Sequence, residues 1–378
     1  MRLPRPVLLT SALVFAMATT TAVTWGAAQA STPKISTVSL KMTKAYTPHA
    51  PAGATDDYHC TLLNPHVTRN SYVISSQFFP GSKEDHHAIL FLVPPALAAT
   101  AEKDNAADNG NGWSCFGEAP LPNTSLGQIS NTPWLTAWAP GHGLDILPKG
   151  TGISLPAGSL VIMQVHFNLL VGDKPVKNSL VLHTVPATTP LLPLKLDLMP
   201  APPDIPCPAG VTGPLCSRAA SLANLGQRFG QSAVGFVDTL ESICGRNPAN
   251  PPEGDTTSCD WPIYKSGYIV RDGAHMHLTG VSFKMVLDPG TPQAKTILNV
   301  PAYNFDYQKA YDLKTPVPVK AGDKVEVSCT YNPKLAQELP LLRKVAPHFI
   351  TWGDGSSDEM CLGLMWTSNS IPDNLAAV

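Results

Sequence analysis

The sequence predicts an all-β fold of two tandem antiparallel β-sandwich domains, jelly-roll-like in form, with a short helical insertion at the start of the second. Three observations support this prediction. Proline makes up 38 of 378 residues, roughly twice the average frequency, which disfavours long helices. Short apolar or alternating runs bounded by turn residues recur along the chain, as in sheet proteins. The chain is also longer than one hydrophobic core usually supports, which favours two domains.

The first 30 residues have the pattern of a secretory signal peptide. Arg2 and Arg5 precede an apolar run from Val7 to Ala18, and Ala28-Gln29-Ala30 matches the small-x-small pattern of a cleavage site. We expect Sec-type export, cleavage after Ala30 and a secreted chain that has no membrane association after cleavage. An uncleaved anchor is the alternative, although the run is short for a membrane span.

Runs with strand character recur along the rest of the chain. Eight examples are Tyr72–Phe79, His87–Val93, Gly158–Phe167, Ser179–Thr184, Tyr268–Leu278, Val281–Leu287, Lys324–Tyr331 and Cys361–Thr367. The segment Lys103–Gly112, rich in glycine and asparagine, is expected to form an exposed loop.

The middle of the chain predicts a change of structure. Pro186–Pro208 is dense in proline and poor in charge, so it is expected to be a stiff extended connector rather than a strand or helix. We therefore place the first domain at 31–190, the connector at 191–208 and the second domain at 209–372. Ser217–Gln231 has Leu222, Leu225 and Phe229 at helical spacing, which predicts the helical insertion.

Charge and cysteine content limit the function classes. The formal net charge is −2 and the basic residues are scattered, so the chain has no electrostatic footprint for nucleic acid and no polybasic membrane patch. The cysteines form an even set in an exported chain, without a CxxC pattern, and predict four disulfides. They are Cys60, Cys115, Cys207, Cys216, Cys244, Cys259, Cys329 and Cys361.

Two groups of histidines suggest metal binding. His275 and His277 would share one face of a strand, at a spacing that suits two imidazoles on one metal. A thioether such as Met360 would favour copper, above all Cu(I). His86 and His87 precede an apolar run; in a regular strand one ring would enter the core and the other solvent, so they can share a metal only where the backbone is irregular.

Each remaining candidate has a structural alternative. His166 ends an apolar run, with Gln164 on the same strand face; taken alone, it is more often a core histidine than a ligand. Met360 taken alone is more often a core methionine. Its position is unusual, however, because it follows the glycine-rich segment 353–357 and precedes Cys361, which can fix it through a disulfide.

Together these residues resemble the copper type II ascorbate-dependent monooxygenases, the family of dopamine β-monooxygenase and peptidylglycine α-hydroxylating monooxygenase, and the chain looks like a secreted bacterial-type member. The resemblance runs from about Tyr58 to Trp366. Its motifs, in order, are Tyr58-x-Cys60, His86-His87, Trp138-Ala139-x-Gly141, Leu147-Pro148, Gln164-Val165-His166, His275-Met276-His277-Leu278-Thr279-Gly280, Tyr303-x-Phe305-x-x-Gln308-x-x-Tyr311, Gly322-Asp323, Cys329-x-Tyr331-Asn332 and Asp358-Glu359-Met360-Cys361.

The resemblance implies two β-sandwich domains, each with one copper on the facing wall of a solvent-filled cleft. It assigns an electron-transferring copper to three histidines and an oxygen-binding copper, where a substrate C–H bond is hydroxylated, to two histidines and a methionine. The first set is His86, His87 and His166; the second is His275, His277 and Met360, which with Gln164 are the expected catalytic residues. The resemblance therefore also implies two coppers per chain, ascorbate or a similar reductant, oxygen and a small-molecule substrate.

The resemblance also implies two disulfides, Cys60–Cys115 and Cys329–Cys361. The other four cysteines allow three connectivities, of which local pairing, Cys207–Cys216 and Cys244–Cys259, is the simplest.

Two departures from the family concern the substrate. Gly273 stands where peptide-amidating members have an arginine that clamps the peptide carboxylate, and Leu364 stands where they have a tyrosine of the substrate site. Both argue against peptide amidation. Two other functions stay open, namely a copper-binding or copper-buffering protein without turnover, and a structural or carbohydrate-binding β-sandwich in which the histidines are incidental.

Overall fold

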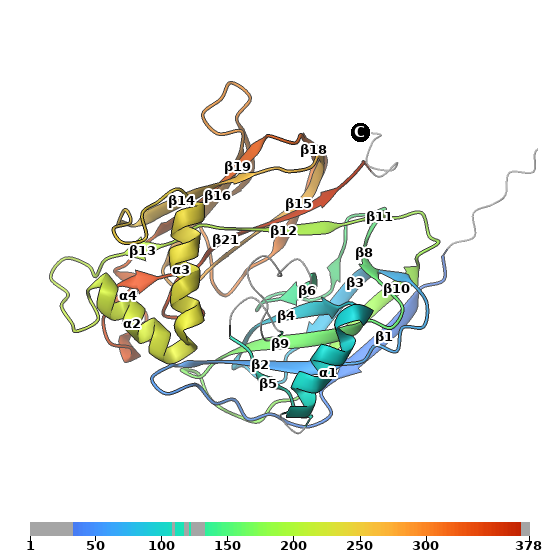
Figure 1. Ribbon diagram of the computed structural model, residues 1–378, viewed down its shortest axis with the longest axis horizontal. Helices are drawn as coiled ribbons and strands as arrows, with labels where there is room; N and C mark the ends of the chain where they lie inside the picture. Colours follow the sequence, from blue (N-terminus) through green and yellow to red (C-terminus); the bar gives the residue numbers. More distant parts are fainter. Residues whose placement is uncertain (1–32, 108–109, 117–120, 122–132, 372–378) are drawn as a thin grey trace, which may run out of the picture. The chain divides into compact units, whose positions relative to one another are not determined.

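The computed structural model describes residues 33–107, 110–116, 121 and 133–371 (Figure 1). The expected signal peptide lies outside these residues. The longer strands are β1 (Ser36–Lys41), β2 (Asp56–Leu63), β3 (Ser71–Phe79), β4 (Asp85–Val93), β6 (Trp134–Trp138), β8 (Thr151–Leu155), β9 (Leu160–Asn168), β10 (Ser179–Pro186), β12 (Lys195–Pro200), β14 (Thr256–Pro262), β15 (Gly267–Met276), β16 (Gly280–Leu287), β17 (Lys295–Val300), β18 (Ala310–Val319), β19 (Lys324–Tyr331) and β21 (Cys361–Ser368).

The described part of the chain also contains short strands, α-helices and the 3-10 helices Pro95–Leu97 and Leu342–Lys344. The two-residue strands are β5 (Trp113–Ser114), β7 (Asp145–Ile146), β11 (Leu192–Pro193), β13 (Asp204–Ile205) and β20 (Ile350–Thr351). The α-helices are α1 (Ala98–Ala107), α2 (Arg218–Phe229), α3 (Gln231–Ile243) and α4 (Leu335–Glu338). No helix of the described residues is long and apolar enough to cross a membrane.

Two sheets in the first half of the chain enclose one core. One has the order β1-β10-β3-β8-β11, with β7 also paired to β3, and the other has the order β5-β2-β9-β4-β6. Their pairings are antiparallel except for β11 with β8. Val73 and Phe78 from the first sheet meet Leu90, Val161 and Met163 from the second in a single buried cluster. Apolar residues on every second position of facing strands produce this arrangement.

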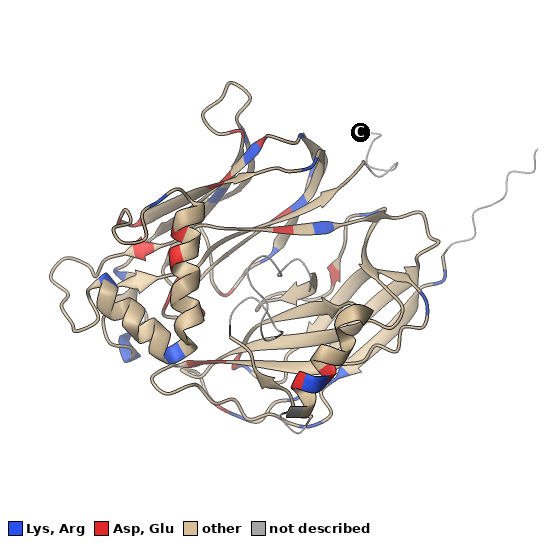
Figure 2. Ribbon diagram, viewed as in Figure 1, with Lys and Arg blue, Asp and Glu red and all other residues tan. Residues whose placement is uncertain are grey.

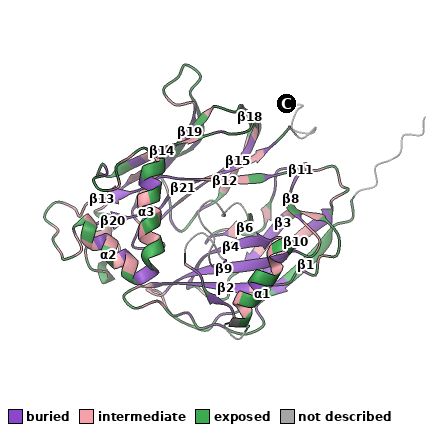
Figure 3. Cartoon of the chain, viewed as in Figure 1, coloured by how far each residue is buried: buried purple, intermediate pink, exposed green. Residues whose placement is uncertain are grey.

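A second pair of antiparallel sheets encloses another core. Their orders are β12-β21-β15-β18 and β14-β19-β16-β17. Ile269 and Met365 from the first sheet pack with Phe283, Met285 and Val327 from the second. Figure 3 shows that buried residues concentrate on the strands of the sheets, whereas the helices carry many exposed residues. The predicted all-β class with antiparallel sandwiches is therefore confirmed.

The predicted strands and disulfides agree with the structure. Each of the eight expected runs contains a strand whose ends lie within a few residues of the prediction. The disulfides are those expected, Cys60–Cys115, Cys207–Cys216, Cys244–Cys259 and Cys329–Cys361. The last one joins β19 to β21 across the second core, directly beside Met360.

Two sequence-based expectations about local structure were wrong. The expected loop Lys103–Gly112 begins inside helix α1, because the alanines of Ala98–Ala107 favour a helix. The expected connector contains β12, which pairs with β21 along its whole length. Proline is absent from Lys195–Met199, so the backbone N–H groups of this stretch can join the sheet. The division into domains at 191–208 stays a prediction.

The predicted helical insertion exists and continues into a second helix. Ser217 caps α2, since its hydroxyl accepts a hydrogen bond from the Ala220 N–H, and Leu225 and Phe229 are buried. Gly230, with φ +89°, separates α2 from α3, which was not predicted. Lys and Arg residues are interspersed with Asp and Glu over the strands and helices (Figure 2).

A largely buried group of four ionisable residues connects these helices to β13. Arg218 bonds the carboxylate of Asp204 at 2.5 Å, and Nη1 of Arg246 lies 3.8 Å from a carboxylate oxygen of Glu241. Burial, together with the neighbouring Asp204, raises the pKa of Glu241 to about 9, and the two arginines only partly oppose this. Glu241 is therefore protonated at neutral pH in the folded protein.

This predicts a pH-dependent effect of Glu241→Gln. In the unfolded chain the carboxyl has its ordinary pKa of 4.5, so between about pH 4.5 and 9 the unfolded state binds fewer protons and native stability falls as pH rises. The glutamine variant lacks this loss. Urea unfolding at pH 5 and pH 8 should show the variant gaining on the wild type by more than about 1.4 kcal/mol, the value of one pKa unit. Exposed Glu253→Gln is the control; an equal offset at both pH values contradicts the prediction.

Candidate metal centre and its pocket

The first set of histidines lies on the adjacent strands β4 and β9. Asp85 is opposite Phe167 and His87 is opposite His166, so two residues of β4 span one step of β9. This β-bulge breaks the alternation of side chains and allows both rings of the pair to point the same way. The His86 ring lies 5.3 Å from that of His87 and 4.9 Å from that of His166, between centroids.

The His166 ring is held on several sides. Its Nε2 lies 2.9 Å from a carboxylate oxygen of Asp56, and its Nδ1 lies 3.1 Å from Nε2 of His87. Tyr58 stacks on it with 4.2 Å between ring centroids. Burial raises the pKa of Asp56, but the hydrogen bond and charge of His166, with hydrogen bonds from Ser356 and the neighbouring threonine, outweigh burial and lower it overall. Asp56 is therefore an ionised group that orients His166.

The second set begins at the end of β15. His275 and His277 lie with ring centroids 5.2 Å apart, as expected for alternate residues of a strand. Nδ1 of His275 lies 2.6 Å from the side-chain oxygen of Gln308, and Nδ1 of His277 lies 3.1 Å from the carbonyl oxygen of Asp358. Such contacts fix the ring orientation and leave the Nε2 atoms for a ligand. Nε2 of His277 is buried without a hydrogen-bond partner.

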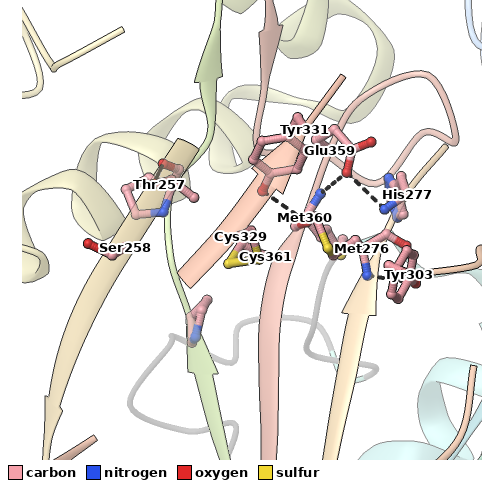
Figure 4. Close-up of a disulfide and its surroundings, with 12 residues drawn as sticks. Thr257, Ser258, Met276, His277, Tyr303, Cys329, Tyr331, Glu359, Met360 and Cys361 are labelled. Atoms are coloured by element: carbon pink, nitrogen blue, oxygen red, sulfur yellow. Dashed lines mark hydrogen bonds between the residues drawn. A yellow bond between two sulfur atoms is a disulfide. The ribbon is translucent and has the colours of Figure 1, made fainter. Parts of the chain in front are cut away.

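Met360 directly precedes β21, the neighbour of β15. Glu359 joins the two strand ends: its carboxylate accepts hydrogen bonds from the backbone N–H of His277 at 2.8 Å, of Thr279 at 2.6 Å and of Met360 at 3.3 Å. Figure 4 shows this carboxylate between His277 and Met360, with the Cys329–Cys361 bridge close by. Burial raises the pKa of Glu359 to about 7, although these bonds lower it in part.

The two sets of histidines touch each other. The ring centroids of His87 and His275 are 5.4 Å apart, and His86 stacks at 4.1 Å on Phe305, which in turn lies 6.3 Å from the His277 ring. This differs from the expected arrangement on facing walls of a solvent-filled cleft. Apolar ring surface is buried in the contact, which favours close packing. Within the described residues, no three His, Cys, Asp or Glu side chains form a group that could hold a metal ion.

Burial makes four of the histidines neutral. It is the largest cause that lowers the pKa of His86, His87 and His277 well below the ordinary value, and neighbouring histidines add to it. The pKa of His275 falls to about 4 for the same main reason. Neutral imidazole has the free lone pair that a metal requires.

The segment 353–358 connects Met360 to the rest of the site. Arg228 of α2 forms a buried bidentate ion pair with Asp358, at 2.7 and 2.9 Å. The Ser356 hydroxyl donates to Asp56 at 2.6 Å, and the Tyr58 hydroxyl donates to the carbonyl of Asp354 at 2.8 Å. The residues before Met360 are thus bonded to the surroundings of His166.

A pocket of about 1270 Å³, including the part that opens to solvent, adjoins both sets of histidines. His87, His275 and Met360 contribute to its wall, and so does Gln164, whose amide donates to the Cys115 carbonyl at 3.0 Å. Leu364 also faces it. A Cβ atom built at Gly273 would lie 3.2 Å from Leu364 Cδ1, so the absence of a side chain there leaves room for the leucine.

Sequence reasoning identified the histidines but not the residues that orient them. Asp56 and Glu359 accept the bonds described above; Glu359 was part of a family motif without an assigned role, and nothing in the local sequence of Asp56 distinguishes it from a surface carboxylate at a strand end. Gln308, Tyr58 and Phe305 were part of the family motifs without an assigned role. Their contacts with His275, His166 and His86 now supply one.

Comparison with known proteins relates the C-terminal part of the chain to one family. Residues 255–370 match the family described as copper type II ascorbate-dependent monooxygenase, C-terminal domain. This segment contains His275, His277 and Met360. No curated protein matches the chain.

Solved structures give weaker similarities. They include allantoicase, at 7% identity and TM-score 0.18 over 75% of this chain and 76% of that one. The 11S allergen from Cocos nucifera has 10% identity and TM-score 0.16 over 88% and 90%. A Bacillus subtilis oxalate decarboxylase mutant has 7% identity and TM-score 0.17 over 88% and 77%. TM-scores this low do not support any statement about the fold or function of this chain.

The buried ion pair predicts a large effect of Arg228→Met. The change leaves the Asp358 carboxylate buried without its partner, which should lower the free energy of unfolding by about 3–5 kcal/mol. Urea unfolding measures this. The control is Arg343→Met, which changes an exposed arginine and should stay within about 0.5 kcal/mol of the wild type. A loss below about 1 kcal/mol for Arg228→Met would show that the pair does not hold this segment.

Proposed function

We propose that this chain is a secreted copper-dependent monooxygenase that hydroxylates a C–H bond of a small organic substrate with oxygen and a one-electron reductant such as ascorbate. The observation that carries the proposal is the match of residues 255–370 to the monooxygenase family, because that segment supplies one complete expected ligand set. The neighbouring histidines on β4 and β9 supply the other.

The side chains at the end of β15 suit a copper ion. His275 and His277 have Nδ1 engaged by neighbouring oxygens, and the unpaired buried Nε2 of His277 is a group that a metal would satisfy. Met360 adds a soft thioether from the adjoining strand, a donor that favours Cu(I). Copper at these three residues would supply oxygen binding and one-electron chemistry.

The first histidine set would hold the second copper only after its side chains move, because they do not form a group of three that could hold an ion in the described structure. The 3.1 Å between His87 Nε2 and His166 Nδ1 is close to the separation of two nitrogens that share one metal at about 2.0 Å. Nε2 of His86 is buried without a partner. Asp56 would hold the His166 ring in place, and the ring contact between His87 and His275 would give the two sets a short connection for electrons.

The remaining residues would control the access of substrate and water to the copper ligands and would fix the positions of those ligands. The pocket beside His275 and Met360 would hold the substrate with its C–H bond toward that set, and the apolar wall would exclude water. Gln164, fixed by the Cys115 carbonyl, would place a polar side chain on the same wall. Glu359 would keep Met360 and His277 at a constant separation.

A copper-buffering protein without turnover is the second candidate, since buried neutral histidines favour binding in either case. Oxygen consumption separates the two functions. A structural or carbohydrate-binding sandwich is less favoured, because the unpaired Nε2 atoms of His86 and His277 are costly unless a ligand satisfies them.

Metal analysis tests the two-site proposal. The purified protein should bind two coppers per chain, and His87→Ala and His275→Ala should each lose one, because each histidine belongs to one set. His183→Ala is the matched control, since this histidine bonds Ser75 at 3.0 Å outside both sets, and it should keep both coppers. Loss of both coppers from a folded single variant would reject independent sites.

Met360→Leu tests the proposed sulfur ligand. The change is close in volume and should cost less than about 1.5 kcal/mol, but it should remove the copper–sulfur signal from X-ray absorption of the reduced protein and greatly lower ascorbate-driven oxygen uptake. Met360→His should keep the second copper with altered redox balance and little turnover. Met365→Leu, at a buried core methionine of β21, is the control. A persistent sulfur signal with normal turnover in Met360→Leu contradicts the assignment.

A further inference from the structure

We propose that the pocket binds an uncharged, mainly apolar molecule that carries one hydrogen-bond acceptor. The proposal rests on the proposed function in treating this ligand as the substrate. The pocket is the space of about 1270 Å³ beside His275 and Met360. Much of its wall is aliphatic or aromatic, including Ile89, Leu135, Trp138, Leu147, Leu364 and Trp366. Such a wall favours apolar ligands.

The charged side chains of the wall balance one another. They are Asp145, Arg271, Lys309 and Asp354, two of each sign. Arg271 is not available to a carboxylate ligand, because it bonds Asp145 through two nitrogens at 2.9 and 3.2 Å and Asp312 through Nε at 2.5 Å. Lys309 lies over the rings of two tyrosines, at 5.0 and 5.5 Å from their centroids. An anionic ligand would therefore lose hydration in a wall where Arg271 is already paired and where Lys309, over two tyrosine rings, is the remaining cation.

Several polar groups of the wall are already bonded within the protein. The hydroxyls of Ser76 and Thr136 bond each other at 2.6 Å. Gln308 bonds His275 and the Phe305 carbonyl. The indole N–H of Trp138 donates to the His142 carbonyl at 2.9 Å. These groups have little capacity left for a ligand.

Two residues that line the pocket, Trp134 and His142, each have a ring nitrogen that differs from these bonded groups. Nε1 of Trp134 and Nε2 of His142 are buried without a hydrogen-bond partner in the described part of the chain. An indole N–H can only donate, so a carbonyl, ether or hydroxyl oxygen of the ligand would satisfy it. Burial, the largest influence, lowers the pKa of His142, which keeps this ring uncharged as well. The unpaired Trp134 donor is the reason for including one acceptor in the ligand.

Calorimetry of the purified full-length chain without copper tests the ligand class with three probes of similar size. Propiophenone is neutral with an acceptor, propylbenzene is neutral without one, and 3-phenylpropanoate is an anion. Propiophenone should bind about fivefold more tightly than propylbenzene, as expected for one hydrogen bond. It should bind more than about tenfold more tightly than the anion. Equal or tighter binding of the anion would overturn the proposal.

Two matched variants test the donor. Trp134→Phe should reduce the advantage of propiophenone over propylbenzene to less than about twofold. Trp138→Phe removes an indole whose N–H is already bonded, so it should keep that advantage; near-ultraviolet circular dichroism checks that both variants are folded. An advantage that survives in Trp134→Phe overturns the role of this residue.

A charge placed in the wall gives a second test. Leu364→Lys should raise the affinity for 3-phenylpropanoate relative to propiophenone by more than about tenfold. Thr367→Lys places the same charge on β21 at a residue that bonds Asp197 and should leave the ratio unchanged. An unchanged ratio in Leu364→Lys would overturn the assignment of the pocket.

These binding results are independent of turnover. If the neutral probe binds in the expected order but the copper-loaded protein consumes no oxygen with ascorbate, the ligand class stands and the proposed function fails. If oxygen uptake occurs only with the anion, the function stands and the ligand class fails.

Discussion

The carboxylate of Glu359 is the group on which the second ligand set depends. It accepts hydrogen bonds from the backbone just after β15 and just before β21, which couples the position of His277 to that of Met360. A strand end normally leaves its backbone N–H groups to solvent or to a turn. Here one buried acid satisfies three of them; its burial raises its pKa to about 7, and these hydrogen bonds offset part of that rise.

A second network joins this region to the first histidine set. Ser356 and His166 bond the same carboxylate oxygen of Asp56, and Tyr58 both stacks on His166 and bonds the carbonyl of Asp354. The segment before Met360 therefore has one end fixed by Glu359 and its middle fixed on β2. A displacement of side chains in one histidine set would therefore reach the other set through these hydrogen-bonded groups rather than through solvent.

The sequence predicted the strands well because their apolar residues alternate, and it predicted α2 because Leu225 and Phe229 lie at helical spacing. It missed α3, whose Val234, Gly235 and Val237 have low helix propensity; packing of Phe236 on Trp352, at 5.4 Å between centroids, stabilises that helix. The composition of the connector hid β12, since five of its six residues, Lys195–Met199, contain no proline and only the last, Pro200, is one. Such errors arise where tertiary contacts override local preference.

The same limit applies to the site. The histidines and Met360 belong to motifs that can be read locally, whereas Asp56 meets Ser356 across 300 residues of chain. Its burial depends on the complete fold. The contact between His87 and His275 likewise joins strands from different sheets, and no pattern along the sequence specifies their separation.

The β-bulge at the start of β4 has a consequence for how this site is encoded. His86 is the extra residue there, so the orientation of its ring depends on the number of residues between the Pro80-Gly81 turn and β4. Deleting one residue would restore regular alternation and turn one ring of the pair toward the sandwich core, even with every histidine retained. The number of residues in this short segment therefore helps to decide which ring nitrogens face the site. Two chains that keep His86 and His87 but differ by one residue upstream would present different imidazole nitrogens to a metal.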